Sequence, residues 1–114
     1  MNNVRSLDEL DSLLLNICRS KLIMLYFGSP YCNPCKQLQQ EINKETFINT
    51  HPKLYIIYID VSNDPDDIAE LYNINVYPTQ LFITLDSNNK VIINNKIEGL
   101  NLQKIEDIYN NFII

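Results

Sequence analysis

Three cysteines are the residues of this sequence whose type and spacing best suit chemistry. Cys32 and Cys35 form a C-x-x-C motif, while Cys18 stands apart from them. Two thiols at this spacing can interconvert between a dithiol and a disulfide, or they can supply half of the ligands of a zinc ion. A structural zinc site needs four ligands, and only Cys18 and His51 remain as candidates. We therefore expect a redox pair, no metal, and a packing or bystander role for Cys18.

The position of the motif at a predicted helix start assigns different roles to the two thiols. Pro34 suits the first turn of a helix, so a helix is expected to open at the motif with Cys32 at its N-terminus. Unpaired N–H groups and the helix dipole favour the thiolate there, and the thiolate is the attacking species. Cys35 follows one turn later and is expected to be more buried, because Leu38 continues its face. Cys32 would attack a disulfide, and Cys35 would resolve the mixed disulfide.

Apolar patterns and turn residues predict the elements that must position the motif. The predicted strands are 3–5, 22–27, 54–59, 79–85 and 90–94, and the predicted helices are 7–19, 32–51, 64–72 and 102–112. A capping box at Ser6 and Glu9 opens the first helix, and Pro52 stops the second after Phe47 and Ile48. This order predicts an α/β fold in a single domain, residues 1–114, with a mixed sheet of four to five strands flanked by four helices.

Several polar residues receive surface roles in this scheme. His51 is expected to lie exposed near the end of a helix, where a cation suits the dipole. Asn73 is the expected C-terminal cap of helix 64–72. The acidic residues of that segment are expected to form its solvated first turn rather than a metal site; they are Asp64, Asp66, Asp67 and Glu70.

Composition and charge exclude several classes of function. The net charge of −5 argues against general binding of nucleic acid. No run of about 18 apolar residues is present to span a membrane. Three cysteines are too few, and odd in number, for a secreted disulfide framework. The first ten residues lack an apolar stretch behind a basic end, so we expect no secretory signal and a cytoplasmic location, with a trimmed or organellar precursor left open.

Three separated segments resemble the thioredoxin family. Residues 25–36, LYFGSPYCNPCK, resemble the family's active-site strand and turn, with an aromatic residue, Tyr31, before the first cysteine and Lys36 after the second. Residues 76–79, VYPT, resemble its cis-proline loop, and Gly99 falls where the family has a glycine. The predicted order of elements agrees independently, so the resemblance covers nearly the whole chain.

The resemblance implies a thioredoxin fold and a protein dithiol–disulfide oxidoreductase acting as a disulfide reductase. It implies no cofactor beyond the reversible Cys32–Cys35 disulfide. The expected partners are protein disulfide substrates and a thioredoxin reductase, and we expect a monomer. The residues expected to contact substrate are Tyr31, Pro34, Tyr77 and the cis-proline Pro78, with Tyr31 and Tyr77 forming an apolar groove over Cys32.

Departures from the family pattern surround the motif. Tyr26 stands where typical thioredoxins carry a buried Asp, and Ile56 stands where they carry the Lys that pairs with it. Asn33 replaces the usual Gly. We expect Tyr26, Asn33 and Lys36 to tune the site, with Tyr26 either packing in the core or placing its hydroxyl near Cys35.

Two alternative functions therefore stay open. The missing acid–base pair favours an adaptor module that keeps the thioredoxin scaffold with weak redox activity. Tyr77 before Pro78 resembles protein disulfide isomerase domains, although Pro34 is the thioredoxin residue and the isomerase His is absent.

Overall fold

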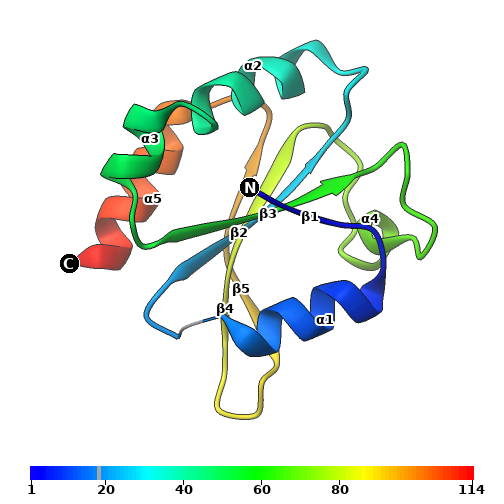
Figure 1. The fold of residues 1–114 in the computed structure, drawn as a ribbon, viewed down its shortest axis with the longest axis horizontal. Coiled ribbons are helices and arrows are strands. Elements are labelled where there is room, and N and C mark those ends of the chain that lie inside the picture. Colours follow the sequence, from blue (N-terminus) through cyan, green and yellow to red (C-terminus); the bar gives the residue numbers. More distant parts are fainter. Residues whose placement is uncertain (18) are drawn as a thin grey trace.

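Five strands form one mixed sheet in the order β1-β3-β2-β4-β5 (Figure 1). This computed structural model describes residues 1–17 and 19–114, so Cys18 lies outside the described residues. The strands are β1 (Asn2–Val4), β2 (Leu22–Gly28), β3 (Leu54–Asp60), β4 (Thr79–Leu85) and β5 (Val91–Glu98). The first three strands are parallel, and β4 and β5 add two antiparallel pairings. The α/β class and the mixed sheet are confirmed, and β5 continues four residues beyond the predicted strand.

Helices cover both faces of the sheet (Figure 1). They are α1 (Leu7–Asn16), α2 (Asn33–Ile42), α3 (Glu45–Thr50), α4 (Ile68–Leu71) and α5 (Leu102–Ile113). The α1 and α4 helices pack on one face and contribute to one apolar cluster, while α2 and α5 contribute to a second cluster on the other face. Among the described residues, no helix has the length and apolar character that crossing a membrane would need.

Strand β2 is the centre of both clusters and leads directly to the motif. All seven of its residues are buried. Leu25 and Phe27 point to the α1–α4 cluster, and Met24 and Tyr26 point to the α2–α5 cluster. Burial on both faces explains why this strand is a continuous apolar run. Its carboxyl end at Gly28 therefore holds the start of the following loop in a fixed place.

The second predicted helix is wrong in one respect, because it is divided in two. Asn43 caps α2 by donating its N–H to the Gln39 carbonyl, and Lys44 then has the extended conformation φ −65°, ψ 138°. This turn reorients α3, so Ile48 is 55% exposed rather than part of the buried side. The described residues consequently form five helices instead of the four predicted.

The predicted helix 64–72 is also wrong in length, since α4 contains only four residues. Asp67 has a positive φ of 53°, which interrupts the helical path. Asp64 instead caps α4 from the preceding loop, where its carboxylate accepts from the N–H groups of Ile68 and Ala69, each at 2.9 Å. Tyr72 is the C-cap of α4, and Asn73 follows it with a left-handed φ of 58°, which is the conformation that ends helices of this kind.

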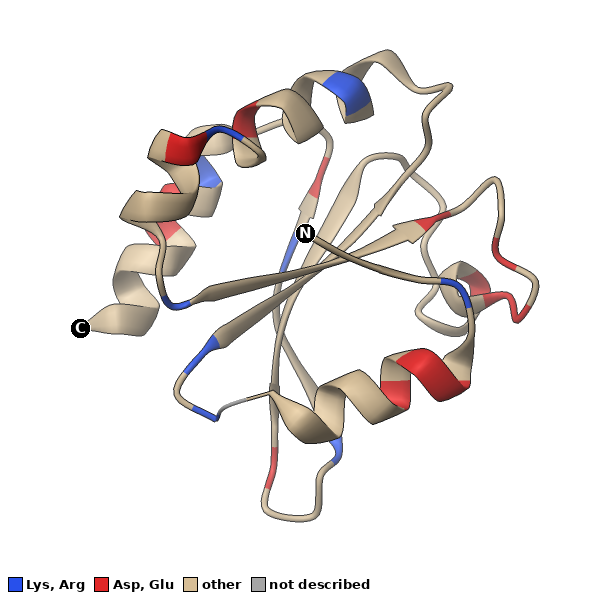
Figure 2. Ribbon diagram, in the orientation of Figure 1, with Lys and Arg blue, Asp and Glu red and all other residues tan. Residues whose placement is uncertain are grey.

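Negative charge gathers at one end of the molecule (Figure 2). Acidic segments cluster at the end of β3, in the loop before α4 and in the first turn of α1, while single acidic positions also occur on α2, α3, α5 and β5. Asp66 in this loop accepts from the Leu7 N–H at 2.8 Å, which joins the loop to the start of α1. The first turn of α2 contains no acidic residue. The charge therefore does not lie on the helix end that carries the cysteines.

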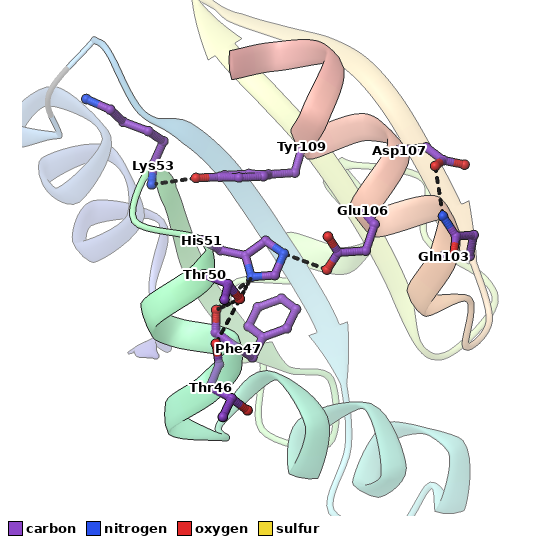
Figure 3. Close-up of polar contacts among 9 residues, drawn as sticks. All are labelled: Thr46, Phe47, Thr50, His51, Lys53, Gln103, Glu106, Asp107 and Tyr109. Atoms are coloured by element: carbon purple, nitrogen blue, oxygen red, sulfur yellow. Dashed lines mark hydrogen bonds and ion pairs between the residues drawn. The ribbon is translucent and has the colours of Figure 1, made fainter. Parts of the chain in front are cut away.

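His51 is buried, at 6% exposure, which corrects the expectation of a surface position. Its ring stacks on Phe47 with centroids 3.9 Å apart and lies between α3 and α5 (Figure 3). Nδ1 donates to the Phe47 carbonyl at 2.6 Å, because a carbonyl can only accept. Nε2 is hydrogen-bonded to Glu106 at 2.6 Å. The residue ties α3 to α5 instead of serving as a solvent-facing cation.

Candidate active site

The local sequence places Cys32 at the N-cap of α2. Cys32 has extended backbone angles, φ −103° and ψ 117°, and its Sγ accepts from the Cys35 N–H at 3.3 Å. Pro34 occupies the first turn, where its missing N–H leaves no bond unmade. Hydrogen bonding to a sulfur favours its anionic form, as does the helix dipole. The position therefore suits an attacking thiolate at Cys32.

Cys32 and Cys35 form a disulfide, with their Cα atoms 5.2 Å apart. Cys32 is half-buried, whereas Cys35 is 1% exposed, so Cys35 is the more buried of the two, as predicted. A bulky disulfide substrate can thus approach the first sulfur and not the second. In the described part of the chain, no group of three or more His, Cys, Asp or Glu side chains is arranged to hold a metal.

A second segment, far away in the sequence, meets the motif. The peptide bond between Tyr77 and Pro78 is cis, and the Tyr77 carbonyl oxygen lies 3.8 Å from Cys32 Sγ. Pro78 is buried, and its carbonyl accepts from the Gly99 N–H at 2.7 Å. Gly99 has φ +93°, which explains a glycine at this bend. These contacts therefore hold the loop before β4 next to Cys32 Sγ.

The other predicted site residues lie on the surface around the motif. Tyr31 is 83% exposed and Tyr77 is 40% exposed, while the surface positions also include Asn33, Pro34 and Lys36. Tyr77 lines an open cavity of about 260 Å³ together with Asp67 and Glu70. Ring–ring contacts among the described residues do not include a Tyr31–Tyr77 pair. The apolar groove formed by these two rings stays a prediction.

Tyr26 both packs in the core and places its hydroxyl near Cys35, the two positions predicted for it as alternatives. Its ring is fully buried, and its hydroxyl donates to the Cys35 carbonyl at 2.7 Å. Burial raises the pKa of Tyr26, and the nearby Tyr58 raises it further. In register, Tyr58 lies opposite Tyr26, whereas Ile56 lies opposite Met24. A tyrosine pair with centroids 5.0 Å apart thus occupies this part of the core.

Two residues near the site are absent from the sequence predictions. Gly28 lies just after the predicted strand 22–27, and a Cβ there would lie 2.5 Å from Tyr26 Cε1. Gln80 is fully buried opposite Tyr26 on β4, and its Nε2 donates to the Gly99 carbonyl at 3.4 Å. Two local signals could have identified these residues. Gln80 is a glutamine inside the apolar run TQLFITL, and Gly28 follows the aromatic Tyr26 by two positions, on the same face of one strand.

Comparisons with known proteins give consistent findings. The thioredoxin family model matches residues 4–109. A curated relative, the thioredoxin of Ophiophagus hannah, is 29% identical over 94 residues, which are 82% of this chain and 82% of the relative. The solved thioredoxin of Trichomonas vaginalis has a TM-score of 0.84 at 17% identity, over 98% of this chain and 96% of its own. Fasciola hepatica thioredoxin has a TM-score of 0.80 at 20% identity, over 98% of this chain and 99% of its own. At these identities the two structures show a shared fold alone.

Proposed function

The chain belongs to the thioredoxin family, and from this membership we propose that it reduces disulfides of other proteins, with Cys32 as nucleophile and Cys35 as resolving thiol. The Cys32–Cys35 pair makes the chain a dithiol–disulfide oxidoreductase of thioredoxin type. The observation that carries the proposed roles is the asymmetry of the pair: Cys32 caps α2 and is reachable, while Cys35 is buried one turn later.

The proposed reaction has two exchange steps. The Cys32 thiolate attacks one sulfur of a substrate disulfide, forms a mixed disulfide, and displaces the other sulfur as a thiolate that takes a proton from solvent. Cys35 then loses its thiol proton and attacks Cys32 Sγ. The Cys32–Cys35 disulfide forms, and the second substrate thiolate leaves. Two electrons pass from the protein dithiol to the substrate, which balances the reaction without a further cofactor.

The substrate segment is proposed to lie across the motif and the cis-proline loop. Tyr31 and Pro34 would contact it from one side, and Tyr77 and Pro78 from the other. The 3.8 Å approach of the Tyr77 carbonyl oxygen to Cys32 Sγ supports this location, because a backbone acceptor there can bind a substrate N–H. The exposed Lys36 and Asn33 are proposed to tune the thiolate from the first turn of α2.

The cellular setting is a further part of the proposal. A thioredoxin reductase would return the Cys32–Cys35 disulfide to the dithiol, and the chain would act as a monomer in the cytoplasm. The small, odd number of cysteines supports a reducing compartment. Fractionation of cells and size-exclusion chromatography of the purified chain test the location and the oligomeric state.

Insulin reduction with a thioredoxin reductase and its electron donor present tests the proposed activity. We expect turbidity from precipitated insulin chains, accompanied by continuous consumption of the donor. A protein that binds partners yet gives neither signal would support the adaptor alternative, which the replacements at Tyr26 and Ile56 favour. Rearrangement of scrambled disulfides without net reduction would support the isomerase alternative.

A further inference from the structure

The backbone of Cys35 is held from both sides within the first turn of α2. Its N–H donates to Cys32 Sγ at 3.3 Å, and its carbonyl accepts from the Tyr26 hydroxyl at 2.7 Å. Tyr26 is fully buried, so bulk water cannot replace its hydroxyl at this carbonyl. The two bonds together set the orientation of Cys35 relative to the sulfur that it must attack.

Gly28 leaves the space in which the Tyr26 ring lies. A Cβ at position 28 would come within 2.5 Å of Tyr26 Cε1 and 3.0 Å of the hydroxyl oxygen. Residues 26 and 28 share a face of β2, because strand side chains alternate. An alanine at position 28 would therefore displace the ring that carries the hydroxyl to Cys35.

The two residues directly opposite Tyr26 in the sheet supply no carboxylate. Tyr58 lies opposite it on β3 and contacts its ring edge-on. Gln80 lies opposite Tyr26 on β4, and no group of the described residues donates a hydrogen bond to its buried Oε1. Neither side chain ionises near neutral pH. The polar group that reaches the Cys35 backbone from β2 is thus a hydroxyl whose direct partners across the sheet are neutral. Asp60 is a carboxylate on this face, and it lies opposite Gly28, beside Tyr58.

We propose that Tyr26 is a positioning residue for the resolving step, which holds the Cys35 backbone so that the Cys35 sulfur stays directed at Cys32. Gly28 supports this role by leaving room for the Tyr26 ring. The inference rests on the proposed function, because it requires that Cys35 resolves a mixed disulfide. In this inference the Tyr26 hydroxyl orients Cys35 for the resolving step, at the position where typical thioredoxins carry an acid.

The chemical state of Tyr26 agrees with orientation rather than proton transfer. Burial raises the pKa of its hydroxyl, so the hydroxyl keeps its proton across the neutral range. A hydroxyl that already donates to a carbonyl can direct that carbonyl. It is therefore not the base that takes the proton of the Cys35 thiol.

Reaction of the reduced protein with the aromatic disulfide dithiobis(nitrobenzoate) separates the two steps. The Cys32 thiolate displaces one coloured thionitrobenzoate and forms a mixed disulfide, and the Cys35 thiolate then attacks Cys32 Sγ and displaces the second. Stopped-flow absorbance measures both rates. Tyr26→Phe removes only the hydroxyl and should slow the second release about three- to ten-fold, the factor that corresponds to one net hydrogen bond. The first release should change less than about two-fold.

Two further variants control this experiment. Tyr58→Phe removes a hydroxyl from the ring in contact with Tyr26, and we expect both rates to remain at wild-type values. Gly28→Ala should slow the second release as Tyr26→Phe does, and it carries the same test if Tyr26→Phe does not fold. The double variant should be no slower than the slower single variant, because both changes break one bond. If the double variant slowed the second release by the product of the two single-variant factors, the inference would be overturned.

The pH profile of the second release distinguishes orientation from proton transfer. Orientation predicts that Tyr26→Phe lowers the rate at every pH and leaves the midpoint of the profile in place. A shifted midpoint, or an unchanged second release in the folded variant, overturns the inference. Release of only one thionitrobenzoate by the wild-type protein would instead contradict the proposed function, because Cys35 would then not resolve the mixed disulfide.

Discussion

Two buried polar contacts lie on the α2–α5 face of the sheet, and they join different kinds of partner. The Tyr26 hydroxyl reaches the Cys35 carbonyl beneath the redox motif. The His51 ring reaches Glu106 at the junction of α3 and α5, beyond the other end of α2 (Figure 3). The first contact holds a residue that reacts, and the second holds two helices together.

This difference indicates where the chain uses buried polarity for chemistry and where it uses it for stability. The Tyr26 hydroxyl makes one hydrogen bond, to the Cys35 carbonyl, so its removal breaks that bond and leaves the buried ring in place. His51 has hydrogen-bond partners at both ring nitrogens and a stacked ring, so its loss removes several contacts at once. Variants that break the bond between Tyr26 and Cys35 should therefore change rates, and variants of His51 or Glu106 should change the free energy of unfolding.

Removal of the reactive sulfurs should give the largest effect at the redox end. Cys32→Ser should abolish insulin reduction, because serine supplies no thiolate. Cys35→Ser should accumulate mixed disulfides through Cys32, which mass spectrometry detects. The free energy of unfolding of the reduced protein should change by less than about 1 kcal/mol in Cys32→Ser. Cys35→Ser places a hydroxyl at a buried position and should cost about 1–3 kcal/mol. Adducts on Cys35 in Cys32→Ser, with none on Cys32 in Cys35→Ser, would reverse the assigned roles.

Truncation of His51 should give the largest stability effect of the comparison. His51→Ala should lower the free energy of unfolding by about 2–4 kcal/mol, through a cavity and lost hydrogen bonds. Glu106→Gln retains a hydrogen-bonding side chain and should cost about 1 kcal/mol. Urea denaturation measures both. The rate of insulin reduction per folded molecule should stay at the wild-type value. A loss of rate without a loss of stability would contradict the purely structural role assigned to His51.

Alkaline pH should lower the free energy of unfolding by ionising Tyr58, which lies beside Tyr26. Burial raises the pKa of Tyr58 to about 12 from an ordinary value of 10.0, and the Asp60 charge adds to the effect. A raised folded-state pKa contributes stability that is complete below pH 10.0 and is lost as the pH rises towards about 12. Urea denaturation across this window should show falling stability, and Tyr58→Phe should make the fall shallower. An equally steep fall in the variant would contradict this origin.

Tyr77→Thr should give the smallest effect. The change removes an exposed ring beside Cys32 and leaves the backbone carbonyl in place. Preference among protein substrates should fall by a few-fold, roughly the contribution of one partly exposed aromatic contact. The reaction with a small disulfide should stay nearly constant, because such a reagent does not reach the ring. Equal losses with both kinds of substrate would place Tyr77 in the chemistry instead.

The fold class and the reactive motif could be predicted because both depend on short stretches of chain. Strand β4 (Thr79–Leu85) agrees with its prediction at both ends, since apolar residues and flanking turn residues define it locally. The order of burial of Cys32 and Cys35 follows from helical spacing. The division between α2 and α3 was missed, because the turn at Asn43 and Lys44 contains neither Gly nor Pro to mark it.

The sequence by itself therefore determined the redox pair, its place at a helix start and the mixed sheet, all through periodicity and spacing within single elements. Only the tertiary structure decided what lies beneath the motif and beyond it. The Tyr26 hydroxyl reaches Cys35 because packing of α2 on β2 brings them together, and Gly28 leaves the room. His51 is buried because α5, 55 residues later, supplies Glu106 to its ring. The contacts of Tyr26 with Cys35 and of His51 with Glu106 join separate elements, so they depend on how whole elements pack and not on the residue pattern within one element.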